Sequence, residues 1–510
     1  MAQIEKDLIV PIEDHLGNTR YEALYRREFD SYITVPRHYG IQLYGLPDMA
    51  CLFDGTVIEE SHLSVVRFEL YDAQRLCIKA LRERFFTAKQ MAEGSAGCVL
   101  NLACGKGKTH IGIQRIKDVG RRTIVVCHSN VSVSQWRKNI ARSLPRLSVS
   151  EFHGGGSFPT TDVVIATIHP LVLPSSIERY DKKAFFDWIS SFGHVIYDEI
   201  HIFGSPKFSL VFDLFKARAH LGLSATPERS DGMNIAFRWK IGPILDAKEE
   251  LNIAPPTFEV TVYPITATGA ASRSRPTDEH REGSYAAMVK TLTLSESRVA
   301  VLIETMKKHF REHQLGEENM LIFCNYIEEV NFLFDRLVPA FAAEAMTPAA
   351  GAASAGGGAM TIGRIYENVD ADAISLLADT ARILICTYKK GGTAFSPIRF
   401  RSIVIWSPTR AMVTQAVGRV QRWRDEEGME LGPEGSWNAL PRTIYDFADT
   451  HTIASQQYYN SSMENGHLIP GRRRVYLSAG YRIHSTKETK EMCQKAKEVR
   501  DMFASIGLGK

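Results

Sequence analysis

Short apolar runs alternate with longer amphipathic stretches through most of the chain. In the first half the runs are rich in β-branched residues and end in polar or glycine-rich turns, at residues 98–103, 122–129, 161–168, 194–200 and 219–226. Between them lie stretches with helical spacing, such as VSQWRKNIARSL. Nearly continuous apolar strands that alternate with helices are typical of a parallel sheet covered on both faces. The pattern predicts an α/β domain that binds ligands at the carboxyl ends of its strands.

A second series with the same rhythm follows, with predicted strands at 319–326, 381–388, 401–408 and 442–449. The segment 340–360 is dominated by alanine and glycine, which cannot form a packed core, so we predict a flexible surface insertion. The whole pattern predicts two tandem α/β domains with small additions. We place an N-terminal accessory module at 1–65, the first domain at 66–250, a linker at 251–294, the second domain at 295–455 and a C-terminal tail at 456–510.

The composition is that of an ordinary folded chain. With 510 residues, 44% of them hydrophobic and 23% charged, two or three domains are expected. The net charge of +3 means that a polyanion would be held by local basic patches. The N-terminus does not resemble a signal peptide, and no apolar run reaches the roughly 20 residues that span a bilayer. The eight cysteines form no CxxC pair. We predict a soluble intracellular protein with reduced thiols and no membrane partner.

The stretch NLACGKGKTHIG, residues 101–112, joins a predicted strand to a predicted helix. Leu102 stands where the strict GxxxxGK[ST] pattern has its first glycine, but GKGKT is complete. Backbone N–H groups of such a loop cradle phosphates, and the helix N-terminus favours negative charge. Lys108 would reach the β- and γ-phosphates, and the Thr109 hydroxyl would help to hold Mg²⁺. The alternative is a solvated glycine-rich turn.

Two further motifs end predicted strands of the first domain. In VIYDEIH, Asp198 can orient Mg²⁺ and Glu199 can act as a base on the attacking water. In LGLSATPERSDGM, Ser224 and Thr226 lie at another strand end. By themselves these are an acidic strand end and a hydroxyl-rich turn. Together with the phosphate loop, Ser224 and Thr226 become candidates for coupling the nucleotide to a bound polymer.

The most informative stretch of the second half is TQAVGRVQRW. On a helix, Gln415, Arg419 and Arg422 project from one face. Two arginines suit the charge that develops on a transferring γ-phosphoryl group, although a solvated basic face is the alternative. Gly418 costs about 1 kcal/mol relative to alanine inside a helix, which asks for a packing reason. These motifs, in this order over two α/β domains, predict an ATPase with its site between the domains.

The motifs resemble those of superfamily 2 DExH helicases, and of their XPB-like branch in particular. The resemblance spans residues 70–449 and is carried by LACGKGKT, CHSNVSVSQW, VIYDEIH, LGLSATPERSDGM, KIGPIL and KKGGTAFSPIRF. In size and arrangement the chain is similar to the helicases of large DNA viruses, such as the poxvirus transcript-release helicase and its asfarvirus and iridovirus relatives. The resemblance implies two RecA-like domains, parallel sheets flanked by helices, with ATP and Mg²⁺ as cofactors.

The resemblance also implies a role for individual residues. Those implied to bind the nucleotide are Gln74, Cys104, Gly105, Lys106, Gly107, Lys108 and Thr109, and those in catalysis are Lys108, Asp198, Glu199, Gln415, Arg419 and Arg422. Coupling is implied for His201, Ser224 and Thr226, and nucleic-acid contact for Ser129, Gln135, Trp136, Thr167, Thr387 and Thr393. For Trp136, packing within its own helix is the alternative. Ser396 stands where the family usually has an acidic residue, which bears on the coupling of that motif.

We therefore expect an ATP-dependent nucleic-acid helicase or translocase, acting on DNA rather than RNA and connected with viral transcription. The expected partners are nucleic acid and an RNA polymerase complex, and the expected oligomeric state is a monomer. A viral chain of this kind would lie in the host cytoplasm or the virion. Two alternatives stay open: a duplex translocase or remodeller that does not separate strands, and a catalytically weak nucleic-acid-binding scaffold.

Overall fold

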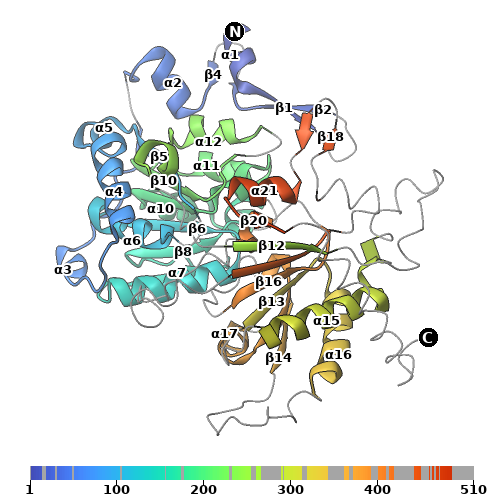
Figure 1. The fold of residues 1–510 in the computed structure, drawn as a ribbon. Coiled ribbons are helices and arrows are strands. Elements are labelled where there is room, and N and C mark those ends of the chain that lie inside the picture. The colour runs from blue at the N-terminus through green and yellow to red at the C-terminus, as the bar shows by residue number, and fades with distance from the viewer. Residues whose placement is uncertain are drawn as a thin grey trace. The chain divides into compact units, whose positions relative to one another are not determined.

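The computed structural model divides into two compact units, Met1–Pro255 and Pro256–Lys510 (Figure 1). It describes residues 2–13, 19–28, 32–48, 51–103, 106–155, 157–173, 177–228, 232–253, 260–265, 289–290, 292–312, 319–342, 361–366, 371–391, 400–408, 413–417, 442–448, 459, 462–464, 467–469 and 471–484. Within these ranges no helix is both long and apolar enough to cross a membrane.

The first unit contains a seven-stranded parallel sheet, which confirms the predicted α/β architecture. Each of the five predicted apolar runs overlaps one of its strands, although β5 begins at Ala96, before the predicted run 98–103. In spatial order the strands are β11 (Ile244–Asp246), β5 (Ala96–Asn101), β10 (Ala219–Ser224), β9 (His194–Asp198), β6 (Thr123–Cys127), β8 (Val163–Thr167) and β7 (Val149–Phe152). Because all seven run parallel, their carboxyl ends share one edge of the sheet.

Helices cover both faces of this sheet, and alternate strand residues enter two separate cores. The helices α4 (Asp72–Ala80), α6 (Lys108–Val119) and α7 (Asn130–Ser143) pack on the face to which Leu100 points. The helices α8 (His169–Val172), α10 (Lys182–Ser190), α11 (Val211–Leu214) and α12 (Asn234–Lys240) pack on the face to which Val99 points. Burial on both faces explains why the central strands have continuous apolar sequences.

The N-terminal residues pack on the first domain. They form α1 (Ala2–Leu8), the hairpin β1 (Ile9–Glu13) and β2 (Thr19–Ala23), the hairpin β3 (Arg26–Glu28) and β4 (Tyr32–Thr34), and α2 (Arg37–Tyr44). Leu8 and Tyr39 share a small core with Met233 and Ala236, and the Tyr39 ring lies edge-on to Trp239 at 5.1 Å. The expected accessory module is thus packed on the α12 side of the first unit.

The second unit contains another seven-stranded parallel sheet, as predicted. Its strands in spatial order are β14 (Ile362–Ile365), β15 (Ile383–Thr387), β13 (Asn319–Cys324), β16 (Phe400–Ile405), β17 (Arg442–Phe447), β12 (Val260–Ile265) and β20 (Arg482–Ile483). The helices α15 (Glu296–Glu312) and α16 (Ile327–Ala342) pack on one face. Other helices of this unit include α17 (Ala371–Thr380), α18 (Tyr388–Gly391), α19 (Val413–Val417) and α21 (Arg472–Ser478).

Two of the predicted boundaries of the second domain are wrong. Strand β12 lies in the expected linker 251–294, but it pairs with β17 along its whole length. Strand β20 lies in the expected tail 456–510, but it pairs with β12. The second sheet therefore takes strands from beyond both ends of the predicted range 295–455. Of the expected insertion 340–360, only the last residues of α16 are described.

Candidate nucleotide-binding and catalytic site

The predicted motifs of the first unit lie side by side on the carboxyl edge of its sheet. The register pairs Ser224 with Asn101, Leu223 with Asp198, and Cys127 with Thr167. The edge therefore runs from the phosphate loop after β5, past the ends of β10, β9 and β6, to the ends of β8 and β7. This is the edge at which parallel α/β sheets bind their ligands.

The phosphate loop is fixed by a contact with α4. Gly107 has a φ of 76° and caps α6, whose first residue is Lys108. The Gln74 side-chain amide donates to the carbonyl of Gly107 at 3.3 Å and to that of Lys106 at 3.4 Å. Its oxygen accepts the Tyr71 backbone N–H at 2.9 Å, and the residue is 1% exposed. Gln74 therefore holds the loop, while its predicted contact with adenine stays a prediction.

Gly107→Ala is expected to raise the KM for ATP about tenfold, which corresponds to 1.4 kcal/mol of lost binding. A Cβ at Gly107 would lie 2.0 Å from Nε2 of Gln74, and the positive φ disfavours any L side chain. Steady-state ATP hydrolysis measures this change. The control is Gly120→Ala at the other end of α6, where φ is 61° and the nearest atom to the added Cβ lies at 3.8 Å. Equal KM changes in both variants would contradict the prediction.

Lys108 and Glu199 meet in front of the strand ends. The Lys108 ammonium lies 4.0 Å from a Glu199 carboxylate oxygen and donates to the Leu102 carbonyl at 3.2 Å. Glu199 adopts φ 51° and ψ 53°, a left-handed conformation that costs a non-glycine residue about 1–3 kcal/mol. Strain of this kind is concentrated at functional sites, where the surrounding structure maintains it. The conformation places the Glu199 carboxylate beside the residue predicted to hold the phosphates.

Asp198 lies in an environment that fits a divalent cation. Desolvation and, next, the neighbouring charge of Glu199 raise the pKa of Asp198 to about 7. A cation would stabilise the charged form that this environment penalises. Thr109, in the first turn of α6, supplies the hydroxyl that the motif predicts. Among the described residues no cluster of three or more His, Cys, Asp or Glu forms a metal cage, so Mg²⁺ would take its other ligands from phosphate and water.

The three predicted coupling residues contact one another. Nδ1 of His201 lies 3.4 Å from the second Glu199 carboxylate oxygen and 3.0 Å from the Ser224 hydroxyl. The Ser224 hydroxyl also accepts the Thr226 backbone N–H at 3.0 Å. A continuous set of contacts thus links Lys108, through Glu199 and His201, to the end of β10.

The comparisons with known proteins agree with this geometry. The family described as "Type III restriction enzyme, res subunit" matches residues 67–229. QP509L of African swine fever virus (isolate Tick/Malawi/Lil 20-1/1983), provisionally described as an ATP-dependent RNA helicase, is 25% identical over 78% of this chain and 72% of its own. The DNA 3′-5′ helicase XPB of Mycobacterium tuberculosis is 27% identical over 56% of this chain and 48% of its own.

Mimivirus L396, also provisionally described as an ATP-dependent RNA helicase, is 28% identical over 44% of this chain and 40% of its own. The matched segment of the res-subunit family contains the phosphate loop, the acidic pair and Ser224. The family model and these relatives support a superfamily 2 helicase with relatives in viruses. The predicted family is thereby confirmed, and with it an ATP-dependent enzyme.

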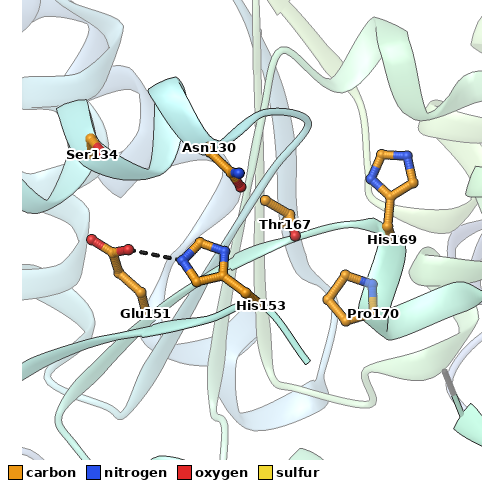
Figure 2. Close-up of a pocket in the computed structure, with 7 residues that line it drawn as sticks. All are labelled: Asn130, Ser134, Glu151, His153, Thr167, His169 and Pro170. Carbon is orange, nitrogen blue, oxygen red and sulfur yellow. Dashed lines mark hydrogen bonds and ion pairs between the residues drawn. The ribbon is translucent and has the colours of Figure 1, made fainter. Parts of the chain in front are cut away.

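Four residues of the first domain were predicted to contact nucleic acid, and one of them is buried in the core. Thr167 lines a pocket of about 430 Å³ at the ends of β7 and β8 (Figure 2). Ser129 caps α7, where its hydroxyl accepts the Ser132 backbone N–H at 3.3 Å, and Gln135 is half-buried on α7.

Trp136 is 1% exposed, and a Cβ at Gly112 would lie 2.5 Å from its ring. The predicted nucleic-acid role of Trp136 is therefore wrong, because its ring packs against α6.

The pocket contains polar residues that the sequence analysis did not single out. Its lining consists of Asn130, Ser134, Glu151, His153, Thr167, His169 and Pro170. Figure 2 shows them around one hollow, with the Glu151 carboxylate bonded to Nε2 of His153 at 2.9 Å. They come from the ends of two neighbouring strands and from the starts of two helices. The sheet topology was the signal that could have identified them, because parallel strands bring such positions together.

In the second domain the structure describes only part of the predicted site. Thr387 ends β15, is 5% exposed, and its hydroxyl has no hydrogen-bond partner among the described residues. Gln415 lies in α19. The remaining predicted residues, Cys104, Gly105, Thr393, Arg419 and Arg422, lie outside the described residues, as does Ser396. Their roles stay predictions.

Proposed function

We propose that this helicase hydrolyses ATP at the carboxyl edge of its first sheet and uses the energy to move along DNA. The observation that carries the proposal is the set of contacts from Lys108 through Glu199 and His201 to Ser224. These contacts join Lys108, which is predicted to hold the phosphates, to Glu199, the predicted base. They also join Glu199 to the end of β10, whose position can change with the bound nucleotide. A scaffold without activity would have no use for the strained conformation of Glu199.

Each residue has a defined task in the proposed mechanism. The loop N–H groups and the Lys108 ammonium bind the phosphates and stabilise the charge that grows on them. Glu199 accepts the proton of the attacking water. Thr109 and Asp198 would hold Mg²⁺, which when bound supplies further charge stabilisation. Arg419 and Arg422 of the second domain are proposed to contact the transferring phosphoryl group, and Gln415 to assist them.

The proposed track is DNA. The motif resemblance to the XPB-like branch and the DNA helicase XPB among the relatives support it, whereas the viral relatives are provisionally described as RNA helicases. Thr167 and Ser129 would contact the sugar–phosphate backbone, which carries no sequence information and suits movement along any sequence. Two viral relatives support a viral setting for the helicase, and its action on viral transcription complexes is part of the proposal.

ATP hydrolysis by the full chain, measured without polymer and with single-stranded DNA, duplex DNA or RNA, tests this proposal. We expect DNA to raise the rate by about tenfold, within the usual range of coupling between two sites. Stimulation by RNA alone would overturn the proposed track, and no hydrolysis under any condition would overturn the proposed motor. Strand displacement, assayed beside displacement of a triplex-forming strand, then separates a helicase from a duplex translocase.

A further inference from the structure

His128, on the carboxyl edge of the first sheet, lies between the proposed ATP site and the pocket at the ends of β7 and β8. The sequence analysis assigned it to neither site. His128 directly follows β6, the strand between β9 and β8. The register pairs Val126 with Tyr197 on one side and Cys127 with Thr167 on the other. One residue beyond the strand, His128 therefore lies beside Glu199 and also beside the start of α8. Neighbouring strands are only about 4.8 Å apart, so both are within reach of an imidazole.

The His128 side chain has an unused polar atom. The residue is half-buried, and its Nδ1 is buried without a hydrogen-bond partner among the described residues. Burial lowers the pKa of His128 to about 4, and the charges of Glu199, His201 and His169 act on it as well. The imidazole is therefore neutral at pH 7. Leaving a buried polar atom without a partner is unfavourable, so a state in which Nδ1 gains a partner is favoured.

The two neighbours of His128 connect to different sites. On one side, Glu199 contacts Lys108 and His201. On the other side, His169 and Thr167 line the pocket at the ends of β7 and β8, with His169 exposed (Figure 2). A polymer in this pocket and a nucleotide at the phosphate loop would therefore both border the same side chain.

We propose that His128 is a positioning residue that couples this pocket to Glu199. When a nucleic-acid backbone occupies the pocket, the loop after β6 moves so that Nδ1–H of His128 donates to the Glu199 carboxylate. The bond then holds Glu199 in the orientation in which it accepts the proton of the attacking water. This inference rests on the proposed function, because it needs a polymer in the pocket and hydrolysis at Glu199. It adds the residue through which one acts on the other.

The test is the ATP hydrolysis rate of full-length His128→Leu across a DNA titration. We expect the basal rate to stay within about twofold of wild type and the maximal stimulation by DNA to fall about tenfold, a typical size for lost coupling. The DNA concentration that gives half-maximal stimulation should not change. In His128→Asn the side-chain amide can take the place of Nδ1, and we expect most of the stimulation to return.

His153→Leu is the matched control, because His153 lines the same pocket but follows β7, three strands along the sheet from β9 and Glu199. It should raise the half-maximal DNA concentration and leave the maximal stimulation unchanged. Two results for His128→Leu would overturn the proposal: the same behaviour as His153→Leu, or equal losses of basal and stimulated rates. If wild type hydrolyses ATP but no polymer stimulates it, the proposed function fails first, and the coupling with it.

Discussion

Glu199→Gln is expected to lower the DNA-stimulated rate of ATP hydrolysis by about 10²–10⁴-fold, the usual contribution of a general base. The glutamine amide keeps the size of the side chain but cannot accept the proton of the attacking water. Binding of ATP should change little, because the phosphates are held by the loop and by Lys108. Steady-state kcat and KM, together with a direct ATP-binding measurement, separate these two effects.

The matched control is Glu249→Gln. Glu249 lies in the short helix α13 (Ala247–Leu251), and its side chain is largely exposed. It has the same chemistry but lies outside the contacts that connect Lys108, Glu199 and His201, so its kcat should equal that of wild type. Undiminished turnover in Glu199→Gln would show that another group is the base. A loss of ATP binding as large as the loss of turnover would show that Glu199 acts by holding the loop.

The strands of the first sheet could be predicted where they are buried on both faces. Strands β5, β6, β8, β9 and β10 have continuous apolar sequences for that reason. The edge strand β7 is mostly half-buried and β11 has three residues, so neither gives a comparable signal. Strand β12 was missed for a different reason. It immediately precedes the polar segment 266–284, whose composition favours a linker, although its own sequence VTVYPI has the alternation of a strand.

The candidate site could be predicted residue by residue, but its contacts could not. Lys108, Glu199 and Ser224 each stand out in a local motif, whereas the bonds that join them cross between strands far apart in sequence. Trp136 illustrates a different error, because its motif predicted a side chain on the surface that contacts nucleic acid. Its helical spacing from Val133 and Ile140 indicates the core face of α7, and the room that Gly112 leaves for the ring is visible only in the structure.

Arg472→Met is expected to lower the free energy of unfolding of the second domain by about 3–5 kcal/mol, the usual cost of removing one partner of a buried ion pair. Arg472 of α21 and Asp446 of β17 are both fully buried, with a guanidinium nitrogen 2.7 Å from a carboxylate oxygen. The Tyr476 hydroxyl donates to the same carboxylate at 2.6 Å. Methionine fills a similar volume but leaves the Asp446 charge without its cation.

The same ion pair explains how the C-terminal segment joins the second domain. The pair fastens α21 to β17, and α21 leads into β20, which completes the edge of the sheet beside β12. In Arg472→Met, hydrogen exchange of the full chain in urea should therefore show earlier opening in β12, β17 and β20 than in the first domain.

Arg473→Met on the exposed face of α21 is the matched control, expected to change the free energy of unfolding by no more than about 0.5 kcal/mol. Adding Asp446→Leu to Arg472→Met should recover much of the loss, because it removes the uncompensated charge. If the double variant were as unstable as the single one, packing rather than charge would hold the segment in place.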